Sequence, residues 1–138
     1  MRIEIIKCLQ DNYSYLLIDE TKSIGCVVDP SEAAPIIKYV ENNNIELKYI
    51  LNTHHHYDHV GGNVELKKKY NSKVVGFKED RNRIPEIDIF VEDNQKWKGI
   101  SSKSTCEVCH RAIQNQFVSQ IFRVYQPMLC RDIRDNWS

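Results

Sequence analysis

Strand patterns alternate with helical patterns along the first half of the chain, and few architectures accommodate this alternation. Between residues 31 and 42, apolar side chains recur three and four positions apart, as on the buried face of a helix. A second helix is expected at 63–70, and Ser31 and Asn63 are expected to cap the two helices. Strands are expected at 2–8, 13–18, 24–28, 47–51 and 74–77. The order strand, helix, strand, helix, strand predicts an α/β layered domain.

The composition excludes several classes of protein. A chain of 138 residues with 41% apolar and 28% charged residues fits one globular domain, not a disordered tail or a membrane protein. Its 19 basic and 19 acidic residues give zero net charge, which argues against a nucleic-acid partner. Charges interrupt the first seven residues, so we expect no export signal and no membrane partner. A cytoplasmic location with five free cysteines is therefore expected, and a mitochondrial location is the alternative.

The character of the sequence changes near residue 99. All five glycines lie at or before that position, and eleven of the twelve lysines precede residue 100. We therefore divide the chain into an N-terminal part, 1–99, and a divergent tail, 100–138, for which a changed exon or reading frame is a hypothesis. One amphipathic helix is expected in the tail from apolar residues at helical spacing. These residues are Ile113, Phe117, Ile121, Val124 and Tyr125.

The chemistry is concentrated in a histidine cluster that directly follows the strand at 47–51. His54 and His56 are two residues apart, so both imidazoles point to the same side of an extended segment. Asp58 and His59 come next and can turn toward a second position. Imidazole and carboxylate ligands without thiolate suit Zn²⁺, Fe or Mn. We therefore expect these four residues to be metal ligands.

The other residues of the cluster are given different roles. His55 is expected to point away from the metal, and Tyr57 to pack against the sheet edge. Gly61 and Gly62 are expected to let the backbone turn sharply into the next helix. Asp29, which precedes Pro30, is either a partner that orients a ligand histidine or a simple turn residue.

The motif H-x-H-x-D-H at 54–59 resembles the signature of the metallo-β-lactamase superfamily, and the closer resemblance is to the glyoxalase II family. The residues that carry it are Asp11-Asn12-Tyr13, Val28-Asp29-Pro30 and the stretch 53–63, within residues 1–98. The resemblance implies the first half of an αββα sandwich with an atypical tail. It also implies two metal ions, taken as zinc with iron or manganese as alternatives.

The resemblance further implies the roles of the ligands and the reaction. His54 and His56 would hold one metal, and Asp58 and His59 the other, with Asp58 also assigned as catalytic. A hydroxide held by the cations would attack the thioester of S-D-lactoylglutathione and release glutathione and D-lactate. The expected partner is thus a small glutathione thioester.

Part of the family pattern has no counterpart in this sequence. The family supplies further histidines and a bridging aspartate, but the T-P-x-H-T-x-G-H stretch is not found here. His110 is the one histidine after His59 and is a candidate for the third histidine ligand. Asp132 and Asp135 are candidates for the bridging carboxylate by residue type only. Activity of the chain is therefore left open. The alternatives are a non-catalytic metal-binding fragment that self-associates through an uncovered sheet face, another hydrolase of the same fold, or a persulfide dioxygenase.

Overall fold

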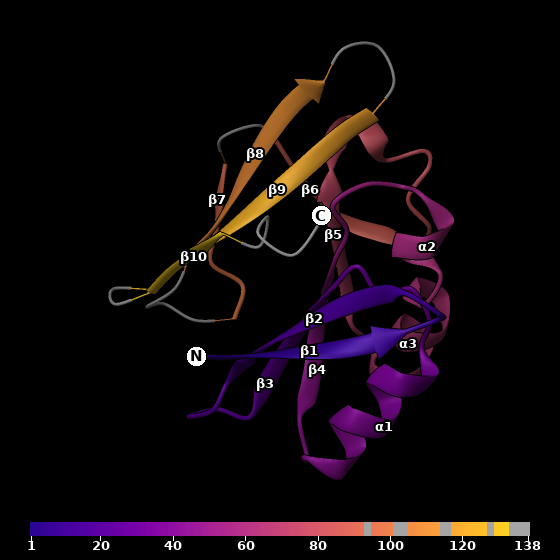
Figure 1. The fold of residues 1–138 in the computed structure, drawn as a ribbon, viewed down its shortest axis with the longest axis vertical. Helices are drawn as coiled ribbons and strands as arrows, with labels where there is room; N and C mark the ends of the chain where they lie inside the picture. Colours follow the sequence, from indigo (N-terminus) through magenta and orange to yellow (C-terminus); the bar gives the residue numbers. More distant parts are fainter. Residues whose placement is uncertain (93–94, 101–104, 114–116, 127–128, 133–138) are drawn as a thin grey trace.

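The computed structural model describes residues 1–92 and 95–100, together with the backbone of three strands at 105–113, 117–126 and 129–132 (Figure 1). Its first sheet has six strands in sequence order, from β1 to β6. The strands are β1 (Arg2–Cys8), β2 (Asn12–Asp19), β3 (Ile24–Val28), β4 (Glu46–Leu51), β5 (Lys73–Phe77) and β6 (Ile87–Val91). The five strands expected in this region are confirmed, with bounds that differ by at most one residue.

The first three strands pair antiparallel, and β3 to β6 pair in parallel. In the parallel part, Val28 lies beside Leu51, and Leu51 lies beside Val75. The carboxyl ends of β3, β4 and β5 therefore lie at one edge of the sheet. Loops that leave this edge are the usual place for sites in α/β proteins.

Two of the connections contain helices of eight or nine residues. α1 (Ala34–Asn42) buries Ile36 and Val40, as its spacing predicts. Ser31 does not cap it, because the helix begins three residues later, with Ala33 at the N-cap position and a proline in its first turn. α3 (Asn63–Tyr70) is also not capped by the Asn63 side chain, since that residue lies inside the helix and turns into the protein. No helix in the described part of the chain is long and apolar enough to cross a membrane.

Apolar side chains pack on both faces of the first sheet. The core between this sheet and the helices α1 and α3 contains Ile6, Cys8, Leu16, Ile18, Val27, Ala33, Ile36, Val40, Ile45, Leu47, Ile50, Leu66, Val74 and Ile84. The opposite face contains Tyr15, Leu17, Cys26, Val28, Leu51, Val75, Val91 and Ile100. Cys8 and Cys26 are buried free thiols. Because β2 to β5 are covered on both faces, their positions and the loops at their ends are well defined.

A second sheet has four strands in the order β10-β9-β8-β7. These are β7 (Lys96–Trp97), β8 (Thr105–Ile113), β9 (Phe117–Gln126) and β10 (Leu129–Asp132). The prediction of a helix through Ile113 and Tyr125 is wrong, because β8 and β9 form an antiparallel pair in which Ile113 lies opposite Phe117. The β-branched and aromatic residues of this segment favour a strand, and strand pairing outweighed their helical spacing. The side chains of residues 101–138, including His110, lie outside the described residues.

A close approach between two chain segments explains the glycine pair. The φ angles of Gly61 and Gly62 are −57° and −87°, which any residue can adopt, so the backbone conformation alone does not require glycine here. A Cβ atom on Gly61 would instead lie 2.3 Å from the carbonyl oxygen of Ser31. The Gly62 N–H donates to the carbonyl oxygen of Pro30 at 2.8 Å. The glycines thus allow the loop with the histidines to pack against the segment that follows β3.

We expect the substitution Gly61→Ala to lower the free energy of unfolding by about 1–3 kcal/mol, because the new methyl group must displace backbone atoms. Urea denaturation measures this change. Val64→Ala is the matched control, because Val64 is exposed on the next helix, and its effect should stay within about 0.5 kcal/mol. Equal stability of Gly61→Ala and the parent chain would contradict the close approach.

Candidate metal centre

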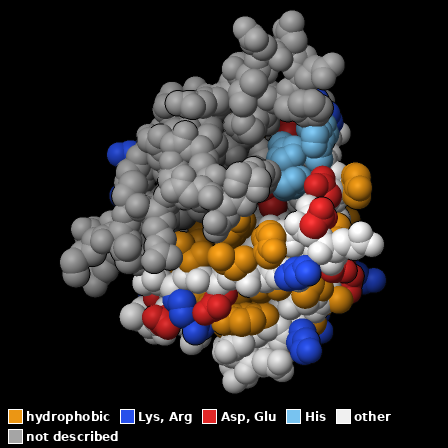
Figure 2. All heavy atoms as spheres, viewed as in Figure 1, with side chains coloured by type: hydrophobic (Ala, Val, Ile, Leu, Met, Phe, Trp, Pro, Cys, Tyr) orange, Lys and Arg blue, Asp and Glu red, His pale blue; other side chains and the backbone are white. Residues whose placement is uncertain are grey.

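The candidate site lies at the sheet edge where β3 and β4 end. Asp29 follows β3, the segment from Thr53 to His56 follows β4, and Asp58 and His59 lie on the short helix α2 (Tyr57–Val60). Figure 2 shows histidine side chains gathered in one surface patch beside acidic side chains. Residues from two separate stretches of the chain, Asp29 and the stretch 53–59, therefore meet at one place.

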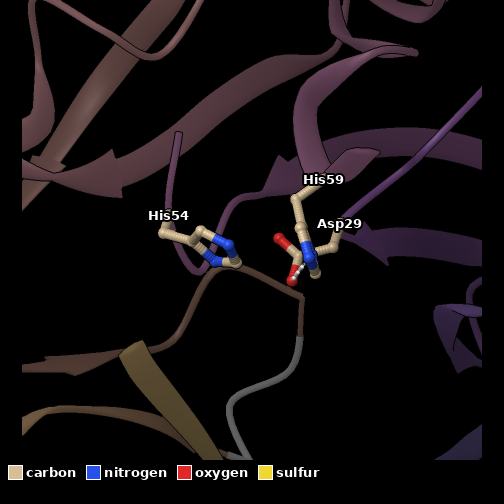
Figure 3. Close-up of side chains that lie close together, drawn as sticks. All are labelled: Asp29, His54 and His59. Carbon is tan, nitrogen blue, oxygen red and sulfur yellow. Dashed lines mark hydrogen bonds and ion pairs between the residues drawn. The ribbon is translucent and has the colours of Figure 1, made fainter. Parts of the chain in front are cut away.

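The Asp29 carboxylate connects these segments. It is 1% exposed and accepts hydrogen bonds from the Thr53 N–H at 2.7 Å and the Thr53 hydroxyl at 2.5 Å. Its Oδ2 also lies 3.0 Å from His59 Nδ1 (Figure 3). Between the two open alternatives for Asp29, these contacts identify a partner that orients a histidine.

The two histidines nearest to Asp29, His54 and His59, are both held through ring nitrogen Nδ1. His54 Nδ1 lies 2.8 Å from the Thr53 hydroxyl, which itself donates to Asp29. His59 Nδ1 faces Asp29, as described above. Contacts at Nδ1 fix the orientation of each ring and leave Nε2 as the nitrogen available to a cation.

The remaining expected ligands lie beside these rings. The ring centroid of His54 is 4.6 Å from that of His56 and 4.1 Å from that of His59. Asp58 Oδ2 lies 3.4 Å from His59 Nε2. The structure thus brings together His54, His56, Asp58 and His59, the four ligand residues expected from the sequence.

The geometry fits a transition-metal ion. Asp29, His54 and His59 offer ligand atoms that all lie within 4.8 Å of one another. Both oxygens of Asp29 already accept hydrogen bonds, so this carboxylate orients His59, and the imidazole nitrogens are the candidate ligand atoms. Imidazole nitrogens with a nearby carboxylate match the ligand preference of zinc and iron.

The environment also sets the protonation state of the ligands. Burial, followed by the charge of His59, lowers the pKa of His54 to about 4, so its ring is neutral at pH 7. Burial lowers the pKa of His59, but the hydrogen bond and the charge of Asp29 outweigh it and raise that pKa overall. Burial raises the pKa of Asp58, but the hydrogen bond from Asn12 and the charge of His59 outweigh it, so this pKa is lowered. A neutral imidazole and an ionised carboxylate are the forms that bind metals.

His55 pairs with a buried carboxylate outside the group formed by Asp29, His54 and His59. Its Nδ1 lies 3.0 Å from Oδ1 of Asp80, a buried residue in the 3₁₀ turn Lys78–Asp80 after β5. Asp80 also pairs with Arg83 at 2.5 Å. Tyr57, expected to pack, is instead 82% exposed. The sequence gives no local signal for the pairing of His55 with Asp80, because 25 residues separate them.

Two buried amides close the back of the loop. Asn52 and Asn63 are both 0% exposed and exchange hydrogen bonds of 3.2 and 2.6 Å through their side chains. Asn52 Nδ2 also donates to the carbonyl oxygen of His59 at 3.1 Å, and Asn63 Nδ2 donates to that of Pro85. Sequence reasoning missed this pair, since asparagine at a strand end usually indicates only a turn. The pair connects the end of β4 with α2 and α3.

We expect Asp29→Asn to weaken binding of Zn²⁺ or Co²⁺ by about 10- to 100-fold, the usual effect of losing a partner that orients a ligand histidine. Competition with a chromophoric chelator measures this affinity. Asp11→Asn is the matched control, because Asp11 is exposed on the turn after β1 and should leave the affinity unchanged. Equal losses in both variants would show that net charge, not the contact with His59, determines binding.

Metal binding should also depend on pH through His59. Its raised pKa means that a proton competes with the cation as the pH falls through that value, with about a tenfold loss of affinity per pH unit below it. His54, with a pKa of about 4, should not contribute until far lower pH. NMR titration of the metal-free chain and affinities measured between pH 5 and 8 test this order. A His54 that titrates before His59 would contradict it.

Comparisons with known proteins identify the family of this chain. Residues 10–94 match the metallo-β-lactamase superfamily model. Over 97 residues, the chain is 68% identical to a hydroxyacylglutathione hydrolase of Pelagibacter ubique (strain HTCC1062) and 45% identical to one of Trichodesmium erythraeum (strain IMS101). These matches cover 70% of this chain but only 41% and 38% of the relatives, so the chain spans about two fifths of their length.

Solved structures show the same fold at low sequence identity. The BLEG-1 B3 metallo-β-lactamase superposes with a TM-score of 0.75 and 16% identity, covering 88% of this chain and 66% of that one. ETHE1 from Myxococcus xanthus gives a TM-score of 0.68 and 17% identity, covering 90% and 54%. The expected αββα-type fold is confirmed by these neighbours, and the chain belongs to the metallo-β-lactamase superfamily.

Proposed function

We propose that residues 1–98 form the metal-binding half of a glyoxalase II-type hydrolase that cleaves the thioester of S-D-lactoylglutathione. The observation that carries this proposal is the convergence of His54, His59 and Asp58 around the buried Asp29. The named relatives support the choice of substrate class, since they are hydroxyacylglutathione hydrolases. Zinc is the proposed metal, with iron or manganese as the alternative.

The residues divide into two ligand pairs in this proposal. His54 and His56 hold one cation, and Asp58 and His59 hold the other, as the family resemblance implies. A bound divalent cation polarises a carbonyl group and lowers the pKa of its water to about 7. Asp58 is ionised at neutral pH, and its lowered pKa keeps it ionised in more acidic solution, so it can also accept a hydrogen bond from an attacking water.

Two residues of the chain fix the orientation of the proposed ligand rings before a cation binds. Thr53 fixes the His54 ring through Nδ1, and Asp29 fixes the His59 ring in the same way. Rigid ligands lose little conformational freedom when a cation binds, so more of the binding free energy is retained. The cytoplasmic location expected from the sequence stays a prediction.

The decisive experiment combines metal analysis with a thioester assay. We expect the purified chain to bind two metal ions, measured by elemental mass spectrometry, and to release glutathione from S-D-lactoylglutathione. His56→Ala should reduce turnover by more than about 100-fold. Loss of a partner that orients a ligand reduces activity by up to that factor, and this substitution removes a proposed ligand itself. His55→Ala is the matched control, because this neighbouring histidine pairs with Asp80 outside the metal position.

The outcome separates the proposal from its alternatives. Two metals with turnover that His56→Ala abolishes support the hydrolase. Metal binding without turnover in the parent chain supports the non-catalytic metal-binding alternative and contradicts the hydrolase. A single bound iron with oxygen consumption on a glutathione persulfide supports the persulfide dioxygenase instead.

A further inference from the structure

Asn12 connects an outer hairpin of the sheet to the metal site. It is the first residue of β2, and the register pairs it with Cys8 across the turn. Its Nδ2 donates to Asp58 Oδ2 at 3.1 Å and lies 3.4 Å from the Asp58 carbonyl oxygen. The contact spans 46 residues, and neither the sequence nor the comparisons give Asn12 a role.

The turn that carries Asn12 is itself held in place. The Leu9 N–H donates to the Glu32 carboxylate at 2.6 Å, and Leu9 adopts a φ of 51°. Cys8 is buried and contacts the Ser14 hydroxyl, which donates to the Asp29 carbonyl oxygen. Asn12 therefore approaches Asp58 from a fixed backbone rather than from a loose loop end.

The oxygen that Asn12 contacts is the one nearest to a ligand nitrogen. Asp58 Oδ2 lies 3.4 Å from His59 Nε2. Two ligand atoms about 2.1 Å from one zinc ion in tetrahedral geometry are about 3.4 Å apart. Asp58 and His59 therefore already have the separation of neighbouring ligands on one cation.

Asp58 also needs a hydrogen-bond donor to stay in this orientation. Its side chain is 32% exposed, and rotation about its side-chain bonds would move Oδ2 away from His59. A carboxylate oxygen can accept a hydrogen bond on one lone pair and bind a cation with the other. The contact from Asn12 is thus compatible with metal binding at the same oxygen.

We propose that Asn12 is a positioning residue that holds the Asp58 carboxylate for the cation shared with His59. This inference rests on the proposed function, because it concerns the second of the two metal positions. The role proposed for Asn12 concerns only the metal position of Asp58 and His59. At the other position, His54 is oriented by the Thr53 hydroxyl, which lies next to it in the chain.

The test uses the full chain and two substitutions at one position. Asn12→Leu has a similar shape but no donor, and Asn12→Gln restores an amide. Titration with Co²⁺, followed by its visible spectrum, should show one of the two binding steps weakened about 10- to 100-fold in Asn12→Leu. The other step should be unchanged, and Asn12→Gln should recover part of the loss. Asn43→Leu is the matched control, since Asn43 lies at the C-terminal end of α1 and its amide donates to the carbonyl oxygen of Tyr39, not to a candidate ligand.

A second measurement needs no metal. In the metal-free chain, one side-chain amide proton of Asn12 should resonate downfield and move upfield in Asp58→Ala, as expected for loss of a hydrogen bond to a carboxylate. An amide resonance that does not respond overturns the inference alone. Equal weakening of both binding steps in Asn12→Leu, together with a lower urea midpoint, overturns it in favour of a structural role.

The two proposals can fail separately. If the parent chain binds no Co²⁺, the metal-dependent function fails and the positioning role fails with it. If the parent chain binds two ions and Asn12→Leu binds them equally well, only the positioning role fails. Selective weakening of one binding step, with partial recovery in Asn12→Gln, supports both proposals.

Discussion

The buried carboxylate of Asp29 is the constraint on which the site depends. A carboxylate that is 1% exposed is strongly destabilising unless its oxygens accept hydrogen bonds. Here the partners come from two other segments, Thr53 after β4 and His59 on α2. Because all three segments must be in place to satisfy Asp29, the arrangement that stabilises this edge of the fold also orients the candidate ligands.

The parallel pairing of the sheet makes that constraint achievable. Strands β3 and β4 end side by side, so Asp29 and Thr53 leave the sheet at the same level. The loop then returns over the segment after β3, and Gly61 permits the approach because a side chain there would meet Ser31. Asn52 fixes the same loop from below through the carbonyl oxygen of His59. Backbone packing and side-chain hydrogen bonds thus act on one short segment.

Local patterns were sufficient to predict strands β1 to β5, the two longer helices and the clustering of the four candidate ligands. The spacing of His54 and His56 and the proximity of Asp58 and His59 are properties of neighbouring residues, and they are visible in the sequence. The contacts of Asp80 with His55 and of Asn12 with Asp58 join residues 25 and 46 positions apart, so only the folded chain shows them. The expectation of a helix in the tail was wrong for a related reason. Helical spacing was present, but pairing between β8 and β9 decided the structure.

Three of the candidate ligands have a described hydrogen-bond contact that orients the side chain. Thr53 holds His54, Asp29 holds His59 and Asn12 holds Asp58. Burial and neighbouring rings disfavour a proton on His54, whereas the carboxylates of Asp29 and Asp58 favour positive charge nearby. A divalent cation satisfies both conditions, because it binds the neutral imidazole directly and is stabilised by both carboxylates. The local electrostatics therefore favour a metal ion over a proton at His54, whereas at His59 the neighbouring carboxylates stabilise a proton as well as a cation.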